Sequence, residues 1–147
     1  MIQISKSALV PYAVDRAFGV VNDVAQYPKF LPGCVGSSVI EHSESQMKAQ
    51  LEVAKAGIKY AFTTSNELLE PQSIILNLVD GPFKHFEGSW KFSALAESVT
   101  KIEFDLNFSM KSGLLARAIE GVVADISGQM VDAMCKRLDV LYGNSHK

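Results

Sequence analysis

The chain has 147 residues, of which 48% are hydrophobic, a composition that suits one domain spanning residues 1–147 and excludes a disordered chain. Its 14 Lys and Arg residues against 16 Asp and Glu residues give a net charge of −2, so no overall attraction to DNA or to anionic lipid is expected. The apolar stretch at residues 8–14 is too short to span a membrane, and the N-terminus lacks the pattern of a signal peptide, so we expect a cytoplasmic protein.

The N-terminal third of the chain predicts one strand followed by short helices. Apolar residues alternate with polar ones over residues 2–8, which is typical of a strand. Residues 13–22 place apolar side chains on one helical face, and residues 24–27 predict a second short helical turn. Pro28 and Pro32 then predict an irregular, extended exit from this turn.

The middle of the chain predicts strands only. Between residues 34 and 108 the hydrophobic period is two almost throughout, with turns predicted at residues 55–57 and at Gly81-Pro82. Six successive strands of this kind, each with one apolar and one polar face, predict an antiparallel meander that is covered on one side only.

The C-terminal segment predicts a long helix that provides this cover. The helix is predicted over residues 113–142, with Ser112 as its N-cap and Gly143 as a left-handed glycine at its end. Its apolar residues recur every three or four positions, in a stripe made of Leu115, Ile119, Val123, Ile126, Met130, Met134, Leu138 and Leu141.

Together these elements predict an α+β fold of the helix-grip type. A curved seven-stranded antiparallel sheet would wrap around the long C-terminal helix, with two short helices after the first strand. A strongly curved sheet cannot pack flush along a straight helix, so we expect an apolar cavity between the two.

Two loops and the inward-facing aromatic residues are the candidates for ligand contact. Residues 27–34 place two prolines beside Phe30 and Leu31, and residues 80–84 join a glycine–proline turn to Phe83. Each loop has two interpretations: it either packs against the core and seals it, or forms the rim or lid of the cavity. The inward-facing aromatic residues likewise either fill the core or line a ligand pocket. The predicted ligand-binding residues are Phe30, Leu31, Tyr60, Phe62, Phe83, Trp90, Phe104, Phe108, Ile119, Val123 and Met130.

The sequence lacks the patterns that would indicate catalysis or metal binding. Cys34 and Cys135 are interpreted as free thiols packed like small hydrophobic residues. His42, His85 and His146 have no partners at ligand spacing. No nucleophile elbow, phosphate-binding glycine loop or flanked carboxylate pair occurs. We therefore predict a protein that is not an enzyme and needs neither a metal nor a cofactor.

Several short motifs resemble one family along nearly the whole chain. The most specific are Tyr27-Pro-Lys-Phe-Leu-Pro-Gly-Cys and Asp80-Gly-Pro-Phe-Lys, accompanied by Ala8-Leu-Val-Pro-Tyr, Gly88-Ser-Trp-Lys-Phe and Leu141-Tyr-Gly. The chain resembles the coenzyme Q-binding START-like family of the polyketide cyclase and lipid transport superfamily. It is most similar there to the bacterial branch of ribosome association toxins. The resemblance implies the START and Bet v 1-like version of the helix-grip fold.

The resemblance also implies two functions. One is binding of ubiquinone, or a similar isoprenoid lipid, in the cavity in support of cellular respiration, with transient contact at the inner membrane. The other is binding to the large ribosomal subunit, which prevents its joining to the small one. A cavity with few charges favours the quinone, whereas ribosome binding favours a basic surface. Four lysines at polar strand positions are the predicted source of such a surface: Lys48, Lys59, Lys91 and Lys101.

Overall fold

The computed structural model describes residues 1–143, so that His146 lies outside the described residues. The first part of the chain forms β1 (Ile2–Val10), α1 (Val14–Asn22), the 3₁₀ turn η1 (Val24–Gln26) and α2 (Tyr27–Phe30). The strands that follow are β2 (Cys34–His42), β3 (Gln46–Lys55), β4 (Ile58–Leu69), β5 (Ser73–Asp80), β6 (Phe83–Ala96) and β7 (Val99–Met110). The chain ends in the long helix α3 (Leu114–Tyr142).

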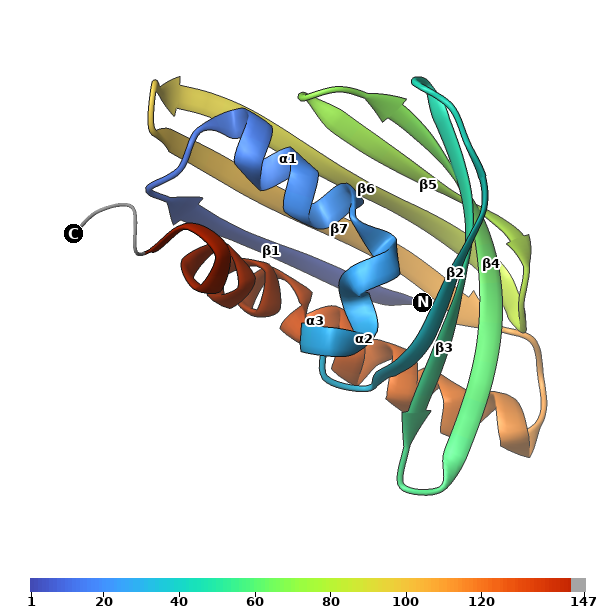
Figure 1. Cartoon of the computed structure of the whole chain (residues 1–147). Coiled ribbons are helices and arrows are strands. Elements are labelled where there is room, and N and C mark those ends of the chain that lie inside the picture. The colour runs from blue at the N-terminus through green and yellow to red at the C-terminus, as the bar shows by residue number, and fades with distance from the viewer. Residues whose placement is uncertain (144–147) are drawn as a thin grey trace.

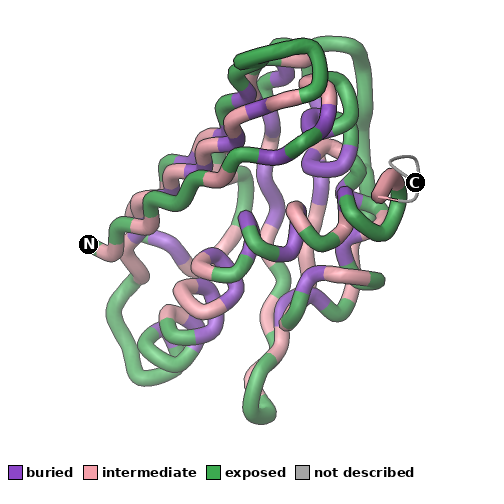
Figure 2. The backbone as a smooth tube through the Cα atoms, turned by 90° about the vertical axis from the view of Figure 1, so that its left-hand side faces the viewer, coloured by how far each residue is buried: buried purple, intermediate pink, exposed green. Residues whose placement is uncertain are grey.

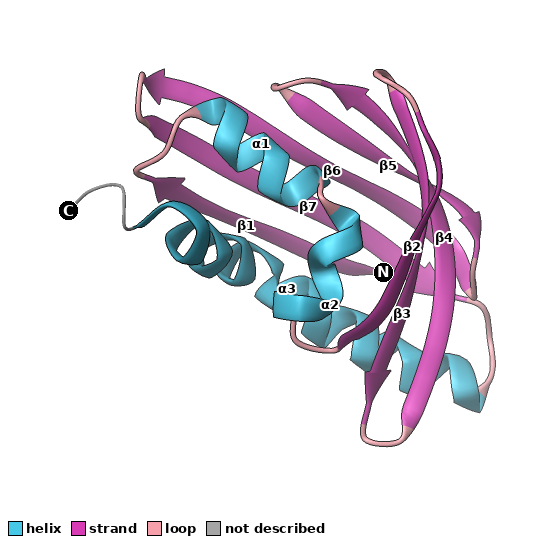
Figure 3. Ribbon diagram, in the orientation of Figure 1, coloured by secondary structure: helices cyan, strands magenta, loops and turns pink. Residues whose placement is uncertain are grey.

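The seven strands form one antiparallel sheet in the order β1-β7-β6-β5-β4-β3-β2. Strands β2 to β7 are a simple meander, whereas β1 pairs with the last strand, from Ile2 opposite Phe108 to Val10 opposite Thr100. Figure 3 shows how the sheet bends, so that β2, β3 and β4 turn across the direction of β1, β6 and β7. The predicted seven-stranded helix-grip fold is therefore confirmed.

All the helices lie on the same face of the sheet. Figure 1 shows α3 running along the concave face below β1, with α1 and α2 beside it. The buried residues lie along the strands and helices in the interior of the molecule, whereas the turns of the hairpins are largely exposed (Figure 2). The core of the protein thus lies between the concave face of the sheet and the helices.

The period-two pattern of the strands determines which side chains reach this core. In β7 the buried side chains are every second residue, namely Thr100, Ile102, Phe104, Leu106 and Phe108. Successive side chains of a strand point to opposite faces of the sheet, so the intervening polar residues of β7 lie on the convex face. The face assignments predicted for this strand are confirmed.

The long helix differs from its prediction at both ends. Helix α3 begins at Leu114, and Gly113 rather than Ser112 occupies the N-cap position, with a φ of 130°. Gly143 adopts right-handed helical angles, with a φ of −59°, so the predicted left-handed end is wrong. The outermost leucines of the predicted stripe are exposed, Leu115 by 62% and Leu141 by 48%, whereas Ala116, next to Leu115, is buried.

The proline-rich segment is helical where an extended chain was predicted. Pro28 lies in the first turn of α2, where its missing N–H leaves no hydrogen bond unmade and its fixed φ suits a helix. The turn closes with a hydrogen bond from Leu31 N to Tyr27 O of 2.8 Å. The chain therefore leaves α2 only at Leu31, whose side chain is buried.

A glycine connects this short helix to the sheet. Gly33 has a φ of +87°, and a Cβ atom at this position would lie 2.6 Å from Ile126 Cγ1 on α3. The carbonyl group of Gly33 accepts a hydrogen bond of 2.9 Å from Ala54 N, which joins the turn to β3. Gly33 thus allows the backbone to pass closely over α3 on its way into β2.

Candidate functional site

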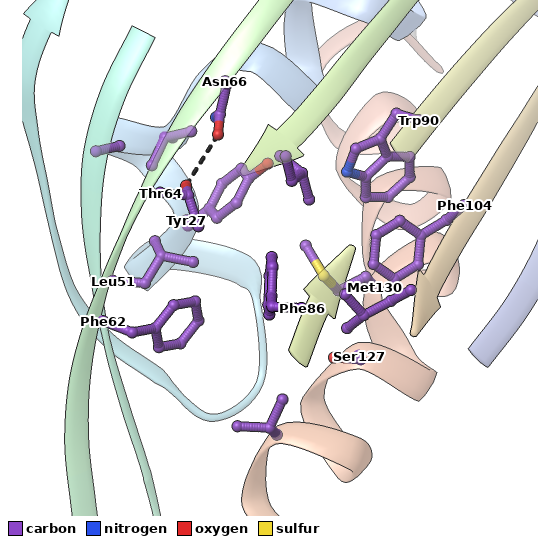
Figure 4. A pocket seen from close by; sticks show the side chains of 15 residues that line it. Tyr27, Leu51, Phe62, Thr64, Asn66, Phe86, Trp90, Phe104, Ser127 and Met130 are labelled. Atoms are coloured by element: carbon purple, nitrogen blue, oxygen red, sulfur yellow. Dashed lines mark hydrogen bonds between the residues drawn. The ribbon is translucent and has the colours of Figure 1, made fainter. Parts of the chain in front are cut away.

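A cavity of about 70 Å³ lies between the concave face of the sheet and the middle of α3 (Figure 4). Strands β3 to β7 provide most of its wall, and the helical elements η1, α2 and α3 provide the rest. Fifteen residues line it: Val24, Tyr27, Ala49, Leu51, Phe62, Thr64, Asn66, Leu76, Phe86, Trp90, Phe104, Leu106, Val123, Ser127 and Met130. The cavity therefore lies where the curvature of the sheet leads us to expect it.

Aromatic side chains form much of the apolar wall. The Trp90 and Phe104 rings lie 4.4 Å apart on adjacent strands, and Trp90 is almost fully buried. Phe62 and Phe86 lie 6.4 Å apart in a tilted arrangement farther along the sheet. Met130 enters from α3, and its flexible side chain can adapt to different occupants.

Three polar groups facing the cavity have no hydrogen-bond partner among the described residues. Thr64 Oγ1 donates a hydrogen bond of 2.9 Å to Asn66 Oδ1, which leaves both N–H bonds of the Asn66 amide unused. Ser127 Oγ and the indole N–H of Trp90 make no hydrogen bond either, and both residues line the cavity. These donors are available to a bound molecule, so this cavity favours a ligand with hydrogen-bond acceptors.

Tyr27 is the one ionisable residue in this lining, among the residues that the structure describes. Its hydroxyl donates a hydrogen bond to the carbonyl oxygen of Val21. Burial raises the pKa of Tyr27 above its usual value, with smaller contributions from Cys34 and Asp23. The phenol therefore stays protonated at neutral pH and positions α2 against α1.

The structure brings five of the predicted ligand residues together in the cavity wall: Phe62, Trp90, Phe104, Val123 and Met130. Tyr60, Phe108 and Ile119 lie outside the lining. Phe83 is buried and packs edge-on against Phe62, Phe86 and Phe108, so it supports the wall from behind. That these residues bind a ligand remains a prediction.

The predicted rim residues Phe30 and Leu31 do not line this cavity. Leu31 is buried in the core, and Phe30 lies on the outer side of α2, where the Arg137 guanidinium is 5.2 Å from the centre of its ring. Of the two aromatic residues in this helical turn, Tyr27 lines the cavity and Phe30 does not, although their rings pack edge-on at 5.8 Å.

The polar part of the lining was not predicted, although the sequence carries a signal for it. Thr64 and Asn66 continue the inward face of β4 that begins with Phe62, since residues two apart in a strand share a face. Both are buried. Polar residues on an otherwise apolar strand face indicate either a hydrogen-bonded core pair or a ligand site.

Both cysteines are free thiols, as predicted. Cys34 is buried and Cys135 is half-buried, and burial raises the pKa of each thiol. A raised pKa lowers the thiolate fraction at neutral pH, so neither group is an activated nucleophile.

The convex face of the sheet does not form the predicted basic surface. Lys59 pairs with Glu52 at 3.3 Å, and Lys101 with Glu103 at 3.7 Å. Lys91 lies opposite Glu103 across the β6–β7 pair, and Lys48 lies opposite Glu41 across the β2–β3 pair. Each of the four lysines thus has a carboxylate neighbour that offsets its positive charge.

Two kinds of feature do not occur within residues 1–143. The described helices include none with enough length and hydropathy to cross a bilayer. The His, Cys, Asp and Glu residues in the same part of the chain form no group of three that could hold a metal ion.

Comparison of the sequence with known proteins gives consistent matches. The family described as polyketide cyclase / dehydrase and lipid transport matches residues 10–135. The ribosome association toxin RatA of Escherichia coli K12 is 46% identical over 142 residues, covering 97% of this chain and 90% of the relative. The mitochondrial coenzyme Q-binding protein COQ10 of Dictyostelium discoideum is 28% identical over 139 residues, covering 92% of this chain and 68% of the relative.

Comparison of the fold with solved structures adds a neighbour that is named as an enzyme. The ZhuI aromatase/cyclase from Streptomyces sp. R1128 superposes with a TM-score of 0.78, covering 95% of each chain at 16% identity. At that identity the likeness establishes the shared fold alone. The same scaffold thus occurs in proteins named as a toxin, as a quinone-binding protein and as a cyclase.

Proposed function

The chain belongs to the polyketide cyclase / dehydrase and lipid transport family, and we propose that it binds a neutral, largely apolar ligand, ubiquinone, in the cavity between the sheet and α3. Binding occurs without chemical conversion of the ligand. The ligand supports respiration by being carried or held available, as the resemblance to coenzyme Q-binding proteins suggests.

The unpaired donors in an apolar wall are the observation that carries this proposal. Asn66, Ser127 and Trp90 offer N–H and O–H groups to the cavity, and the remaining wall is mainly aliphatic and aromatic. A quinone ring carries carbonyl and methoxy oxygens, which accept hydrogen bonds but donate none. Its isoprenoid tail is purely apolar. The two halves of the molecule therefore match the two kinds of wall.

The size of the cavity implies that the wall moves when the ligand binds. About 70 Å³ is room for a few water molecules at ~10–15 Å³ each, and is smaller than a substituted quinone ring. Met130 can change rotamer at little cost, and Phe86 is only half-buried. We expect these two side chains to move and enlarge the cavity when the ligand binds.

The absence of a proton-transfer group favours binding over catalysis. Tyr27 is the one ionisable residue that lines the cavity in the described part of the chain, and burial raises its pKa. A general acid or base works best with a pKa near the working pH. The proposed role is therefore binding, not the conversion for which the cyclase of the same fold is named.

An apolar corner of the molecule supports transient contact with a membrane. Leu114 and Leu115 are 88% and 62% exposed where β7 joins α3. Lys111 and Arg117 flank them and are exposed as well. Exposed leucines beside basic side chains suit the surface of an anionic bilayer, from which an isoprenoid ligand would be collected.

Titration with a short-tailed ubiquinone tests the cavity. Trp90 is the chain's one tryptophan and lines the site, so its fluorescence should be quenched as the quinone binds. Ala49→Leu places a larger side chain in the cavity from β3 and should weaken binding by about tenfold or more, a loss of ~1.4 kcal/mol for each factor of ten. The fold should tolerate the change because the added atoms enter empty space.

The matched control is Ala61→Leu, on the neighbouring strand β4. Ala61 is exposed on the convex face, so the same chemical change there should leave quinone binding and stability unaltered. The proposal fails if the wild-type protein neither retains quinone on purification nor takes it up, or if Ala49→Leu binds as tightly as Ala61→Leu.

The second candidate function is association with the large ribosomal subunit. It is favoured by the 46% identity to a ribosome association toxin along almost the whole of this chain. The purified protein should then co-sediment with isolated large subunits and reduce their joining to small subunits in a sucrose gradient. No co-sedimentation at low salt, where charge interactions are strongest, would remove this candidate.

A further inference from the structure

A second hollow lies outside the sheet, between α2 and the outer side of the C-terminal half of α3. This groove has a volume of about 370 Å³. It shares no residue with the cavity wall. Its lining is Lys29, Phe30, Pro32, Gln129, Asp132, Ala133, Lys136, Arg137 and Val140. We refer to it below as the α2–α3 groove.

The spacing of residues along α3 explains why the groove has a face of its own. Positions 129, 132, 133, 136, 137 and 140 recur every three or four residues, so they lie on one side of the helix. Val123, Ser127 and Met130 occupy the side that faces the cavity. One helix thus presents an apolar face to the sheet and a polar, basic face to α2.

The groove carries uncompensated positive charge. Lys29, Lys136 and Arg137 form no ion pair with any described residue, whereas Lys59 and Lys101 of the convex face each pair with a glutamate. Asp132 is the single acidic residue in the lining. The groove therefore has an excess of two positive charges on a chain whose net charge is −2.

Arg137 is held in place by an aromatic ring. Its guanidinium lies 5.2 Å from the centre of the Phe30 ring, and Phe30 in turn packs edge-on against Tyr27 at 5.8 Å. A guanidinium stacked on a ring keeps N–H donors at its edge, in a fork that matches two phosphate oxygens. The stacking orders this donor before any partner arrives.

We propose that the α2–α3 groove binds the phosphate backbone of RNA, and that it is the surface by which this chain contacts the large ribosomal subunit. The inference rests on the second candidate function above. Lys29 and Lys136 act as point charges on successive phosphates, and Arg137 donates to one phosphate. Phe30, Pro32 and the exposed Val140 provide an apolar wall against which a sugar or base packs.

Salt-dependent binding to isolated large subunits tests the proposal. Each lost phosphate contact removes about 0.7–0.9 from the slope of log affinity against log salt concentration. The variant Lys29→Gln/Lys136→Gln/Arg137→Gln should therefore bind about tenfold or more weakly at moderate salt and lower the slope by about 2. Because Arg137 is half-buried, the double variant Lys29→Gln/Lys136→Gln provides a second measurement at exposed positions only.

The matched control removes the same charge from the convex face. Lys48→Gln/Lys91→Gln/Lys101→Gln should bind subunits within about twofold of the wild type, because these lysines already have carboxylate neighbours. Equal losses in the groove and control variants would overturn the groove assignment while leaving ribosome association intact. No binding by the wild type would overturn both.

Competition with protein-free RNA decides the chemistry of the partner. Purified large-subunit RNA should displace the wild-type protein from subunits, and the groove variants should not bind that RNA. If the RNA fails to compete while intact subunits do, the groove contacts a ribosomal protein and the RNA assignment is wrong. Quinone titration of the same groove variants should match the wild type, because the groove and cavity share no residue.

Discussion

Replacing Leu138 with alanine is expected to lower the free energy of unfolding by about 2–5 kcal/mol. Leu138 is completely buried on α3, the helix that packs on β1, β7 and α1. The change removes buried apolar surface and leaves a space that the surrounding strands cannot close. Urea denaturation followed by circular dichroism would measure the loss as a lower midpoint with an unchanged slope.

Leu141→Ala provides the matched control for this prediction. Leu141 lies one turn later on the same helix and is 48% exposed, so the same truncation should cost roughly 1 kcal/mol or less. The pair also tests where the buried face of α3 ends. Equal losses at the two positions would mean that the helix packs through its last turn.

Gly33→Ala is expected to be nearly as severe, at about 2–4 kcal/mol, because two costs combine. The positive φ of +87° is strained for any residue with a Cβ atom, and that atom would lie 2.6 Å from Ile126 Cγ1. Ile126 cannot easily move away, since a β-branched side chain has one strongly preferred rotamer in a helix. The substitution should therefore push α2 and the start of β2 away from α3.

Gly57, in the turn between β3 and β4, separates the cost of the positive φ from the cost of the steric clash. Gly57 has a similar φ of +83°, but a Cβ atom added there would have no neighbour within 4 Å, so Gly57→Ala should cost only about 1 kcal/mol. In a double-mutant cycle, Gly33→Ala combined with Ile126→Ala should be less destabilising than the sum of the single changes. Additive losses would exclude a direct clash between Gly33 and Ile126.

The sheet could be predicted from the sequence because its strands are covered on one side. In β7 each buried inward residue is followed by a partly exposed residue on the other face, and this alternation predicts both the strand and its face. The helix ends could not be read in the same way. Leu115 and Leu141 continue the apolar spacing of α3 but are exposed, and the small residue Ala116 is the buried one in the first turn.

The candidate site was predicted in its aromatic half only. Trp90 and Phe104 follow from the strand period, whereas the prediction of Phe30 at the cavity rim assumes that the proline-rich segment is a loop. The position of the Phe30 side chain depends on the orientation of α2, a four-residue helix with Pro28 in its first turn. The strand period of β4 also places Thr64 and Asn66 on the inward face. They were not predicted because the cavity was expected to be lined by apolar residues only.

The pairing of the first strand with the last has a consequence for the order in which the chain can fold. The hairpins from β2 to β7 join neighbours in sequence, so each can form soon after its second strand is synthesised. Strand β1 does not pair with the strand that follows it in sequence. It pairs with β7, with Ile2 opposite Phe108, so it cannot pair until β7 has left the ribosome. Until then its apolar residues stay unpaired at the end of the nascent chain, and the N-terminal strand is among the last to reach its native place.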